Sequence, residues 1–215
     1  MRVRRGSSAG TAAQTRAYAS HPDVLAPQLR AEIATVPASP HGRPALIVLM
    51  GLPGVGKSHC ALIICERIGA AHVASDELRS RMFIAPSYVE AENRAIFGAL
   101  TALTDALLAE GHRVVLDATN LVARNREPAV AAARRRGVPV TFVHVTGSEA
   151  ETRARLASRR SDRAPNDHSE ADETIYERMR GQRFEAPPEG YVELVNGDDL
   201  AGQIERVVAA IEAQQ

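Results

Sequence analysis

The chain has 215 residues, of which 45% are hydrophobic and 24% are charged, and its formal net charge is zero. This length and composition are typical of one globular domain with a substantial core and room for a short appendage. They exclude a global electrostatic field that would draw the protein onto nucleic acid or an anionic membrane, and leave only a local basic patch for such binding.

Residues 1–40 read as an N-terminal arm that is separate from the domain at 41–215. Residues 1–20 carry four arginines and no acid, a composition typical of a mitochondrial presequence and also of a disordered arm. We favour an arm that is partly disordered, with a short helix near 24–36. The whole chain is rich in Ala and Arg in the same manner, and the segment has no clear apolar face.

No segment of the sequence predicts a membrane helix or a disulfide framework. The apolar run 45–50 is far shorter than the ~20 residues that span a bilayer. Cys60 and Cys65 lie five apart on one predicted helix, a spacing that fits neither a disulfide nor a zinc motif, so we expect buried thiols. We therefore expect a cytoplasmic protein without membrane contact, and no segment indicates an obligate protein partner.

Strand and helix patterns alternate along the chain from residue 45 onward. Short apolar runs predict strands at 45–50, 71–74, 113–117, 139–145 and 191–195. Helical periodicity predicts helices at 57–68, across 96–107, at 124–136 and across 200–211, and capping pairs predict helix starts after Ser148 and Ser169. This order predicts an α/β fold with a five-stranded, mainly parallel sheet flanked by helices.

A phosphate-binding motif joins the first strand to its helix. Residues 51–58 read GLPGVGKS, a full match to G-x-x-x-x-G-K-S. Glycines in such a loop let successive N–H groups point at phosphates, and the helix N-terminus adds its positive dipole end. We expect Lys57 to bridge the β- and γ-phosphates of ATP and Ser58 to ligate Mg²⁺. The residues expected to contact the nucleotide are Gly51, Pro53, Gly54, Val55, Gly56, Lys57, Ser58 and His59.

Lys57 is the single lysine among the 26 basic residues of the chain. Every other basic position is an arginine. A chain so biased toward arginine uses a compact ammonium only here, which indicates that a planar guanidinium does not suit this position.

The segment after the second predicted strand carries Asp76 and Arg79, three residues apart. On a helix these side chains share a face, so a carboxylate that accepts a hydroxyl proton and a guanidinium that holds an anion could meet one substrate. The competing interpretation is that Ser75 or Asp76 merely caps a helix.

The third predicted strand ends in Asp117, the pattern of an acidic residue that coordinates Mg²⁺ directly or through water. A strand-terminal Asp that caps the following turn is the competing interpretation. We favour the metal role, with Asp117 and Ser58 as the metal ligands, since a phosphate-binding loop without an acidic partner would be unusual.

Four segments together, GLPGVGKS, SDELR, LDATN and RARLASRRSD, resemble the P-loop kinases related to polynucleotide kinase and zeta toxin, often labelled AAA-type ATP-binding proteins. The resemblance spans residues 45–215. It implies the P-loop NTPase fold with a helical lid at about 155–170. The first segment is very specific for nucleoside triphosphates, whereas the other three are short.

The resemblance also implies roles for individual residues. Asp76 takes the position of the general base, and Arg79 that of the arginine which holds a phosphate of the acceptor strand. Asp117 and Asn120 lie on the substrate side, with Thr119 completing their motif. Arg155 and Arg159 fall on the lid, where arginines embrace the ATP phosphates and act in catalysis. A charge run is more often a solvated face, and Arg160 and Arg163 are near substitutes.

The sequence therefore predicts a kinase that uses ATP and Mg²⁺ to phosphorylate a hydroxyl group. Zero net charge and only eight aromatic residues favour a small metabolite as acceptor, whereas the Asp76 and Arg79 spacing favours a polynucleotide 5′-hydroxyl. The alternative function is a nucleotide-hydrolysing switch or regulatory ATPase, in which water replaces the acceptor.

Overall fold

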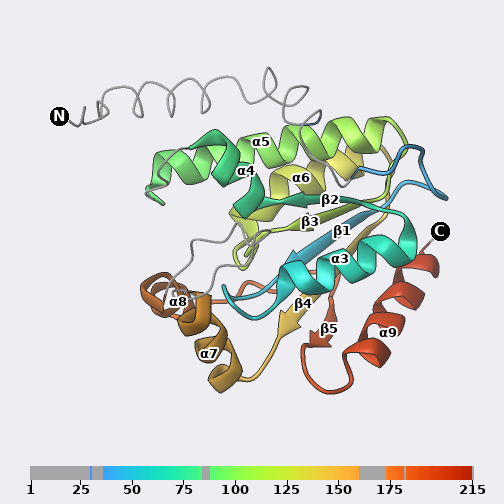
Figure 1. Ribbon diagram of the computed structural model, residues 1–215. Coiled ribbons are helices and arrows are strands. Elements are labelled where there is room, and N and C mark those ends of the chain that lie inside the picture. Colours follow the sequence, from blue (N-terminus) through green and yellow to red (C-terminus); the bar gives the residue numbers. More distant parts are fainter. Residues whose placement is uncertain (1–29, 31–35, 84–87, 160–172, 182, 215) are drawn as a thin grey trace, which may run out of the picture.

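The computed structural model describes residues 30, 36–83, 88–159, 173–181 and 183–214. Its sheet has five strands in the order β2-β3-β1-β4-β5, and every neighbouring pair is parallel (Figure 1). The strands are β1 (Leu46–Met50), β2 (Ala71–Ala74), β3 (Val114–Asp117), β4 (Val140–Thr146) and β5 (Val192–Val195). The predicted α/β class with a P-loop NTPase-like sheet is confirmed, and each predicted strand lies within two residues of its observed bounds.

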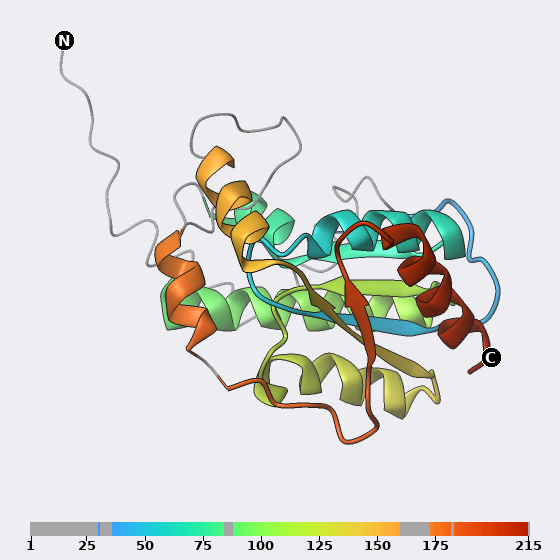
Figure 2. The same ribbon diagram turned by 90° about the horizontal axis from the view of Figure 1, so that it is seen from below.

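Helices cover both faces of this sheet (Figure 2). α3 and α9 pack together on one face, and α5 and α6 pack together on the other. The helices of the described residues are α3 (Lys57–Ile68), α4 (Ser75–Met82), α5 (Glu90–Ala109), α6 (Ala123–Arg135), α7 (Glu149–Arg159), α8 (Glu173–Arg180) and α9 (Leu200–Glu212). Most of the arm at 1–40, the predicted helix at 24–36 and the capping pair at Ser169 lie outside the described residues.

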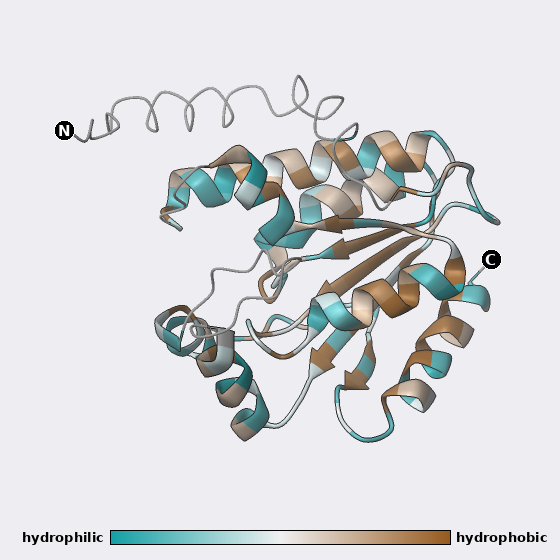
Figure 3. Ribbon diagram, viewed as in Figure 1, coloured by the Kyte–Doolittle hydropathy of each residue, from teal (hydrophilic) through white to brown (hydrophobic). Residues whose placement is uncertain are grey.

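The central strand β1 is fully buried because side chains on both of its faces enter a core. Leu46, Val48 and Met50 face the α5 and α6 side, whereas Ile47 and Leu49 face the α3 and α9 side. Figure 3 shows the resulting band of hydrophobic strands between helices whose outer faces are polar. A continuous apolar run is what a strand buried on both faces requires, so the fold of this region follows directly from the sequence.

The strands end at one edge of the sheet, and this edge positions the site. Asp117 at the end of β3 is in register with Leu49 of β1 and with Ala74 of β2. The loop after β1, the helix after β2 and the carboxylate that ends β3 therefore lie side by side. Ligand sites of open parallel sheets form at this edge, beyond the carboxyl ends of the strands.

The described residues also bear on the two cysteines and on membrane-spanning helices. Both cysteines are free thiols on α3 and both are buried. None of the described helices combines the length and apolar character that a membrane crossing requires.

Candidate active site

The phosphate-binding loop is held tightly against its surroundings. The backbone N–H of Gly51 donates to the Thr119 carbonyl at 3.0 Å, and the Lys57 ammonium donates to the Leu52 carbonyl at 2.8 Å. A Cβ at Gly51 would lie 2.4 Å from the Val145 carbonyl oxygen, a distance that real Cβ atoms do not reach. Close packing therefore requires glycine at this position. A side chain here would clash with the backbone that surrounds the loop.

Gly56 combines a positive φ with a close side-chain neighbour. Its φ of 98° lies in the left-handed region that disfavours side chains, and a Cβ there would lie 2.1 Å from Nδ2 of Asn196. Asn196 directly follows β5 and donates to the Val55 carbonyl at 2.9 Å. We did not predict Asn196 as a site residue. Its position just beyond the end of a parallel strand is the signal that could have indicated it.

Asp117 is buried beside the loop and is held in its charged form. Burial alone would raise the pKa of this carboxyl, but hydrogen bonds from His72 and Ser58 and the charges of His72 and Lys57 outweigh it, so the pKa is lowered. Nε2 of His72 lies 3.1 Å from Oδ2 of Asp117, and both side chains are buried. His72 was not among the residues predicted from the sequence, although it lies on the strand that ends next to Asp117.

Ser58 and Asp117 provide the oxygen atoms that a magnesium site would use. Among the described residues, no group of three or more His, Cys, Asp and Glu side chains could hold a metal by itself. Mg²⁺ in phosphotransfer sites takes one or two protein oxygens and completes its shell with substrate phosphates and water. One hydroxyl and one ionised carboxylate, both in the lining of the cleft, fit that requirement.

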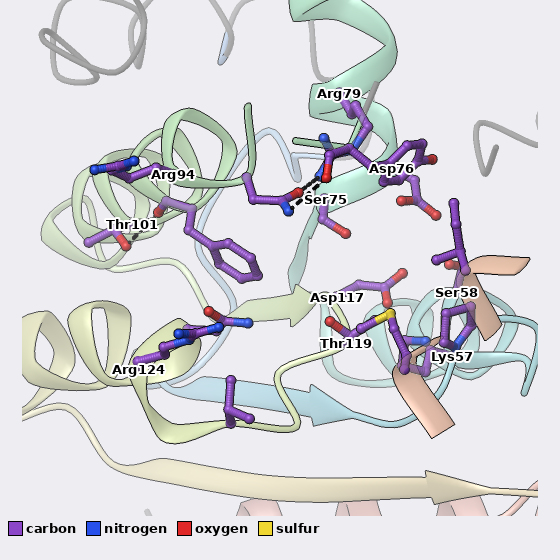
Figure 4. Close-up of a pocket in the computed structure, with 18 of the residues that line it drawn as sticks. Lys57, Ser58, Ser75, Asp76, Arg79, Arg94, Thr101, Asp117, Thr119 and Arg124 are labelled. Atoms are coloured by element: carbon purple, nitrogen blue, oxygen red, sulfur yellow. Dashed lines mark hydrogen bonds between the residues drawn. The ribbon is translucent and has the colours of Figure 1, made fainter. Parts of the chain in front are cut away.

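Asp76 lies in the first turn of α4 and lines the same cleft (Figure 4). The N-cap position of α4 is Ala74, so neither Ser75 nor Asp76 is the N-cap residue of this helix. Asp76 follows β2, and Asp117 ends β3, the neighbour of β2 in the sheet.

Arg79 also lines the cleft but is largely engaged by α5. Its Nη2 donates to Oδ1 of Asn93 at 2.8 Å, its Nη1 lies 3.6 Å from a Glu92 oxygen, and its guanidinium stacks on Tyr88 at 4.3 Å. The side chain is 6% exposed. Arg79 therefore links α4 to α5. It also places a positive charge one helical turn from Asp76.

Asn120 lies beneath the cleft. Its φ of 47° is in the left-handed region, it is fully buried, and its Nδ2 donates to the Leu49 carbonyl at 2.9 Å. It is absent from the cleft lining, whereas Thr119 beside it is part of that lining. The structure therefore places Asn120 as a clip between the ends of β1 and β3.

Two arginines of α7 face in different directions. Arg155 lines the cleft, and its Nη1 donates to the Val55 carbonyl at 3.4 Å. Arg153 instead bonds Glu149 on its own helix and Glu173 and Glu177 on α8. The side chain of Arg159 and residues 160–172, where the rest of the predicted lid falls, lie outside the described part of the chain.

These residues surround one cleft of about 1330 Å³. Pockets for a single small ligand usually have about 300–1,000 Å³, so this volume accommodates a nucleotide and a second molecule. Sequence-predicted residues in the lining are Pro53, Gly54, Gly56, Lys57, Ser58, His59, Asp76, Arg79, Asp117 and Arg155. Gly51, Val55 and Asn120 support the cleft from behind.

Comparison with solved structures reveals the same fold in several kinases and nucleotide-binding proteins. Kti12 from Chaetomium thermophilum, solved with ADP-AlF3, is 25% identical, with a TM-score of 0.63 over 78% of this chain and 97% of that chain. The APS kinase CysC of Mycobacterium tuberculosis, solved with AMPPNP and APS, is 18% identical, with a TM-score of 0.60 over 79% and 98%. A gluconokinase from Sinorhizobium meliloti is 22% identical, with a TM-score of 0.54 over 80% and 95%. No curated protein sequence matches this chain.

The kinase neighbours support the broad resemblance stated from the sequence. A specific relation to polynucleotide kinase and zeta toxin stays a prediction. A family model described as an AAA domain matches residues 46–187, more than half of the chain, and includes the loop, Asp76, Asp117 and α7. The protein therefore belongs to this AAA domain family.

Proposed function

We propose that this protein is an ATP- and Mg²⁺-dependent kinase that transfers the γ-phosphate to a hydroxyl group of an acceptor molecule. The observation that carries the proposal is the meeting of three parts at one sheet edge. The phosphate-binding loop follows β1, Asp76 follows β2, and Asp117 ends β3. All three line a cleft with room for two ligands.

The donor half of the reaction uses the loop and its neighbours. Lys57 holds the β- and γ-phosphates, and Arg155 adds positive charge from α7 to the same end of the cleft. Bound Mg²⁺ supplies positive charge that offsets the charge on the transferred group, and Ser58 and Asp117 are the side chains that would hold it. AMPPNP and ADP-AlF3 in the structures of APS kinase and Kti12 support ATP as the nucleotide.

The acceptor half uses Asp76. The acceptor oxygen forms a bond to the γ-phosphorus while the bond from that phosphorus to the β–γ bridging oxygen breaks. The electron pair of the broken bond leaves with ADP, and the hydroxyl proton moves to the Asp76 carboxylate. Asp117 keeps its charge because its lowered pKa disfavours proton uptake, so the two carboxylates have separate tasks.

The test uses labelled ATP and a panel of hydroxyl acceptors. Lys57→Ala should lose both nucleotide affinity and transfer. Asp76→Asn should bind Mg-ATP within about twofold of the wild type, since Asp76 does not belong to the loop, but should transfer about a hundredfold more slowly or worse. Undiminished turnover in Asp76→Asn would remove the base from the proposal.

A nucleotide-hydrolysing switch is the competing function. It would replace the kinase if the wild-type protein released phosphate to water at the same rate with and without every acceptor. The cleft volume by itself is compatible with both classes of acceptor, a small metabolite and a polynucleotide. The side chains that line the rest of the cleft distinguish these two classes.

A further inference from the structure

We propose that the acceptor is a small hydroxyl compound that carries an anionic group, and that Arg94 of α5 and Arg124 of α6 bind this group. The inference rests on the proposed function, because it names the substrate class of the same cleft. Figure 4 shows both arginines on the side of the pocket away from Lys57 and Ser58. A nucleotide bound at the loop would leave this side for the second ligand.

α5 has two distinct faces, and one of them belongs to the cleft. Leu100, Leu103 and Leu107 enter the core, whereas Arg94, Gly98 and Thr101 line the cleft at the three- and four-residue spacing of one helix face. Gly98 lies in the middle of this 20-residue helix, where glycine is poorly suited to helical structure. A glycine on the cleft face removes a side chain where a ligand can approach the helix closely.

Arg94 and Arg124 are positively charged groups with little compensation from neighbouring acids. Arg124 is exposed and has no ion pair among the described residues. The contact of Arg94 is a 3.7 Å approach to Glu90, with side chains that are 69% and 92% exposed. A contact of this kind between solvated groups is weak and is easily exchanged for a ligand.

Three other cations of the cleft have tasks that the structure makes visible, and Arg135 and Arg178 also line it. Lys57 and Arg155 lie at the phosphate-binding loop, and Arg79 is engaged by Glu92, Asn93 and Tyr88. Arg94 and Arg124 lie on the side of the cleft away from Lys57 and Ser58, where they can recognise a second anion. A guanidinium matches the oxygen geometry of a phosphate or a carboxylate, which are the two forms of anionic group that this arrangement can bind.

The surroundings of the two arginines favour a small molecule over a polynucleotide. Phe97 of α5, Val122 and Pro128 of α6 add apolar walls to the cleft, and Ile175 and Met179 of α8 also belong to its lining. A polynucleotide needs a track of cations along its backbone and aromatic surfaces for its bases. Apolar walls beside a few arginines instead suit a compact ligand with one charged end.

The experiment measures binding of matched pairs of compounds by calorimetry in the presence of a non-hydrolysable ATP analogue and Mg²⁺. Ribose and ribose 5-phosphate test the phosphate form, and glycerol and glycerate test the carboxylate form. A 12-nucleotide single strand with a 5′-hydroxyl tests the polymer. We expect an anionic member of a pair to bind at least tenfold more tightly than its neutral partner.

Arg94→Gln and Arg124→Gln should each weaken binding of that anionic compound by about tenfold to a hundredfold, the range for a charged hydrogen bond. Arg134→Gln is the matched control on α6, because Arg134 pairs with Glu127 and Glu189 and does not line the cleft. All three variants should bind the ATP analogue as the wild type does, which separates this inference from the donor half of the proposed function.

Three results would overturn the inference. The first is equal binding of neutral and anionic members of each pair, or binding of none of them. The second is wild-type affinity for the anionic compound in both Arg94→Gln and Arg124→Gln. The third is tight binding of the oligonucleotide that falls steeply with salt, which would assign the cleft to a polynucleotide. Failure of the wild type to bind the ATP analogue would count against the kinase itself.

Discussion

The imidazole Nε2 of His72 lies 3.1 Å from the Asp117 carboxylate, and both side chains are buried on the neighbouring strands β2 and β3. The ionised carboxylate accepts the hydrogen bond, so the imidazole donates it. This bond fixes Oδ2 of Asp117 and so restricts the orientation of the carboxylate. Partners of this kind orient metal ligands, and their loss typically weakens metal binding by about 10–100-fold.

We expect His72→Leu to raise the Mg²⁺ concentration needed for half-maximal nucleotide binding by about tenfold. His72→Gln, which keeps an N–H donor, should show a smaller effect. The measurement is nucleotide binding titrated with Mg²⁺. His144→Gln serves as a control, because His144 lies on β4 and stacks on Phe184. An unchanged Mg²⁺ requirement in His72→Leu would show that Asp117 does not need this partner.

Gly56→Ala should abolish tight nucleotide binding, since the new Cβ would meet Asn196 at 2.1 Å. Gly137→Ala is the matched control. Both glycines have positive φ, 98° and 67°, but nothing lies within 4 Å of a Cβ at Gly137. The control should cost about 1–2 kcal/mol of unfolding free energy from backbone strain and leave ATP affinity unchanged. Calorimetry and thermal unfolding separate the two effects.

Arg155→Ala and Arg153→Ala should differ although the residues lie two apart on α7. Arg155 borders the loop, so its loss should lower transfer about tenfold or more. Arg153 contacts three carboxylates of α7 and α8, and its side chain is 35% exposed, so its loss should chiefly loosen α8. Limited proteolysis near α8, compared at low and high salt, reports the second effect. Equal loss of transfer in both variants would contradict this division.

Asn120→Ala should destabilise the fold by about 2–4 kcal/mol. The change leaves the Leu49 carbonyl without its amide donor and places Ala at a φ of 47°. Asn120→Gly removes the same hydrogen bond without the backbone strain, so it should be the milder substitution. Urea unfolding measures both. Stability equal to the wild type in Asn120→Ala would show that the clip between β1 and β3 is dispensable.

The two cysteines should make stability depend on pH in the alkaline range. Burial raises the pKa of Cys60 to about 11 and that of Cys65 to about 12, from an ordinary 9.0. The folded protein therefore keeps protons that the unfolded chain releases above pH 9. This contribution to stability is complete below pH 9 and declines as the pH rises toward 11 and 12.

A disulfide-exchange reagent should label neither thiol of the folded protein at pH 8 and both thiols after denaturation. The urea concentration at half-unfolding should decrease when the pH is raised from 8 to 10. The decrease should be smaller in a Cys60→Ala, Cys65→Ala double variant. Rapid labelling of the folded protein at pH 8 would contradict the burial of these side chains.

The sequence predicted those parts of the molecule that depend on local pattern. The apolar run of β1 and the glycine that ends α3 each determine their structure within a few residues, because burial on both faces and a left-handed C-cap leave recognisable residue types. The phosphate-binding loop belongs to the same class. Its glycines, lysine and serine are needed together in one short segment.

Other features depend on contacts between distant segments and leave no local pattern. His72 reads as one more residue of a short strand until β3 places Asp117 beside it. Arg153 and Arg155 face in different directions because of where α8 and the loop lie. The sequence of α7 alone does not show which of the two faces the cleft. The cleft face of α5 is a stripe of mixed polarity that becomes interpretable only with α6 opposite.

The hydrogen bond from Asn196 to the Val55 carbonyl joins residues 141 positions apart. The loop is synthesised early, but this hydrogen bond forms only after β5 has joined the edge of the sheet. A growing chain on the ribosome thus cannot complete its nucleotide cradle until nearly all of the domain has emerged. Nucleotide binding would then mark the end of folding, and chains truncated before Asn196 would emerge without the activity that their intact motif suggests.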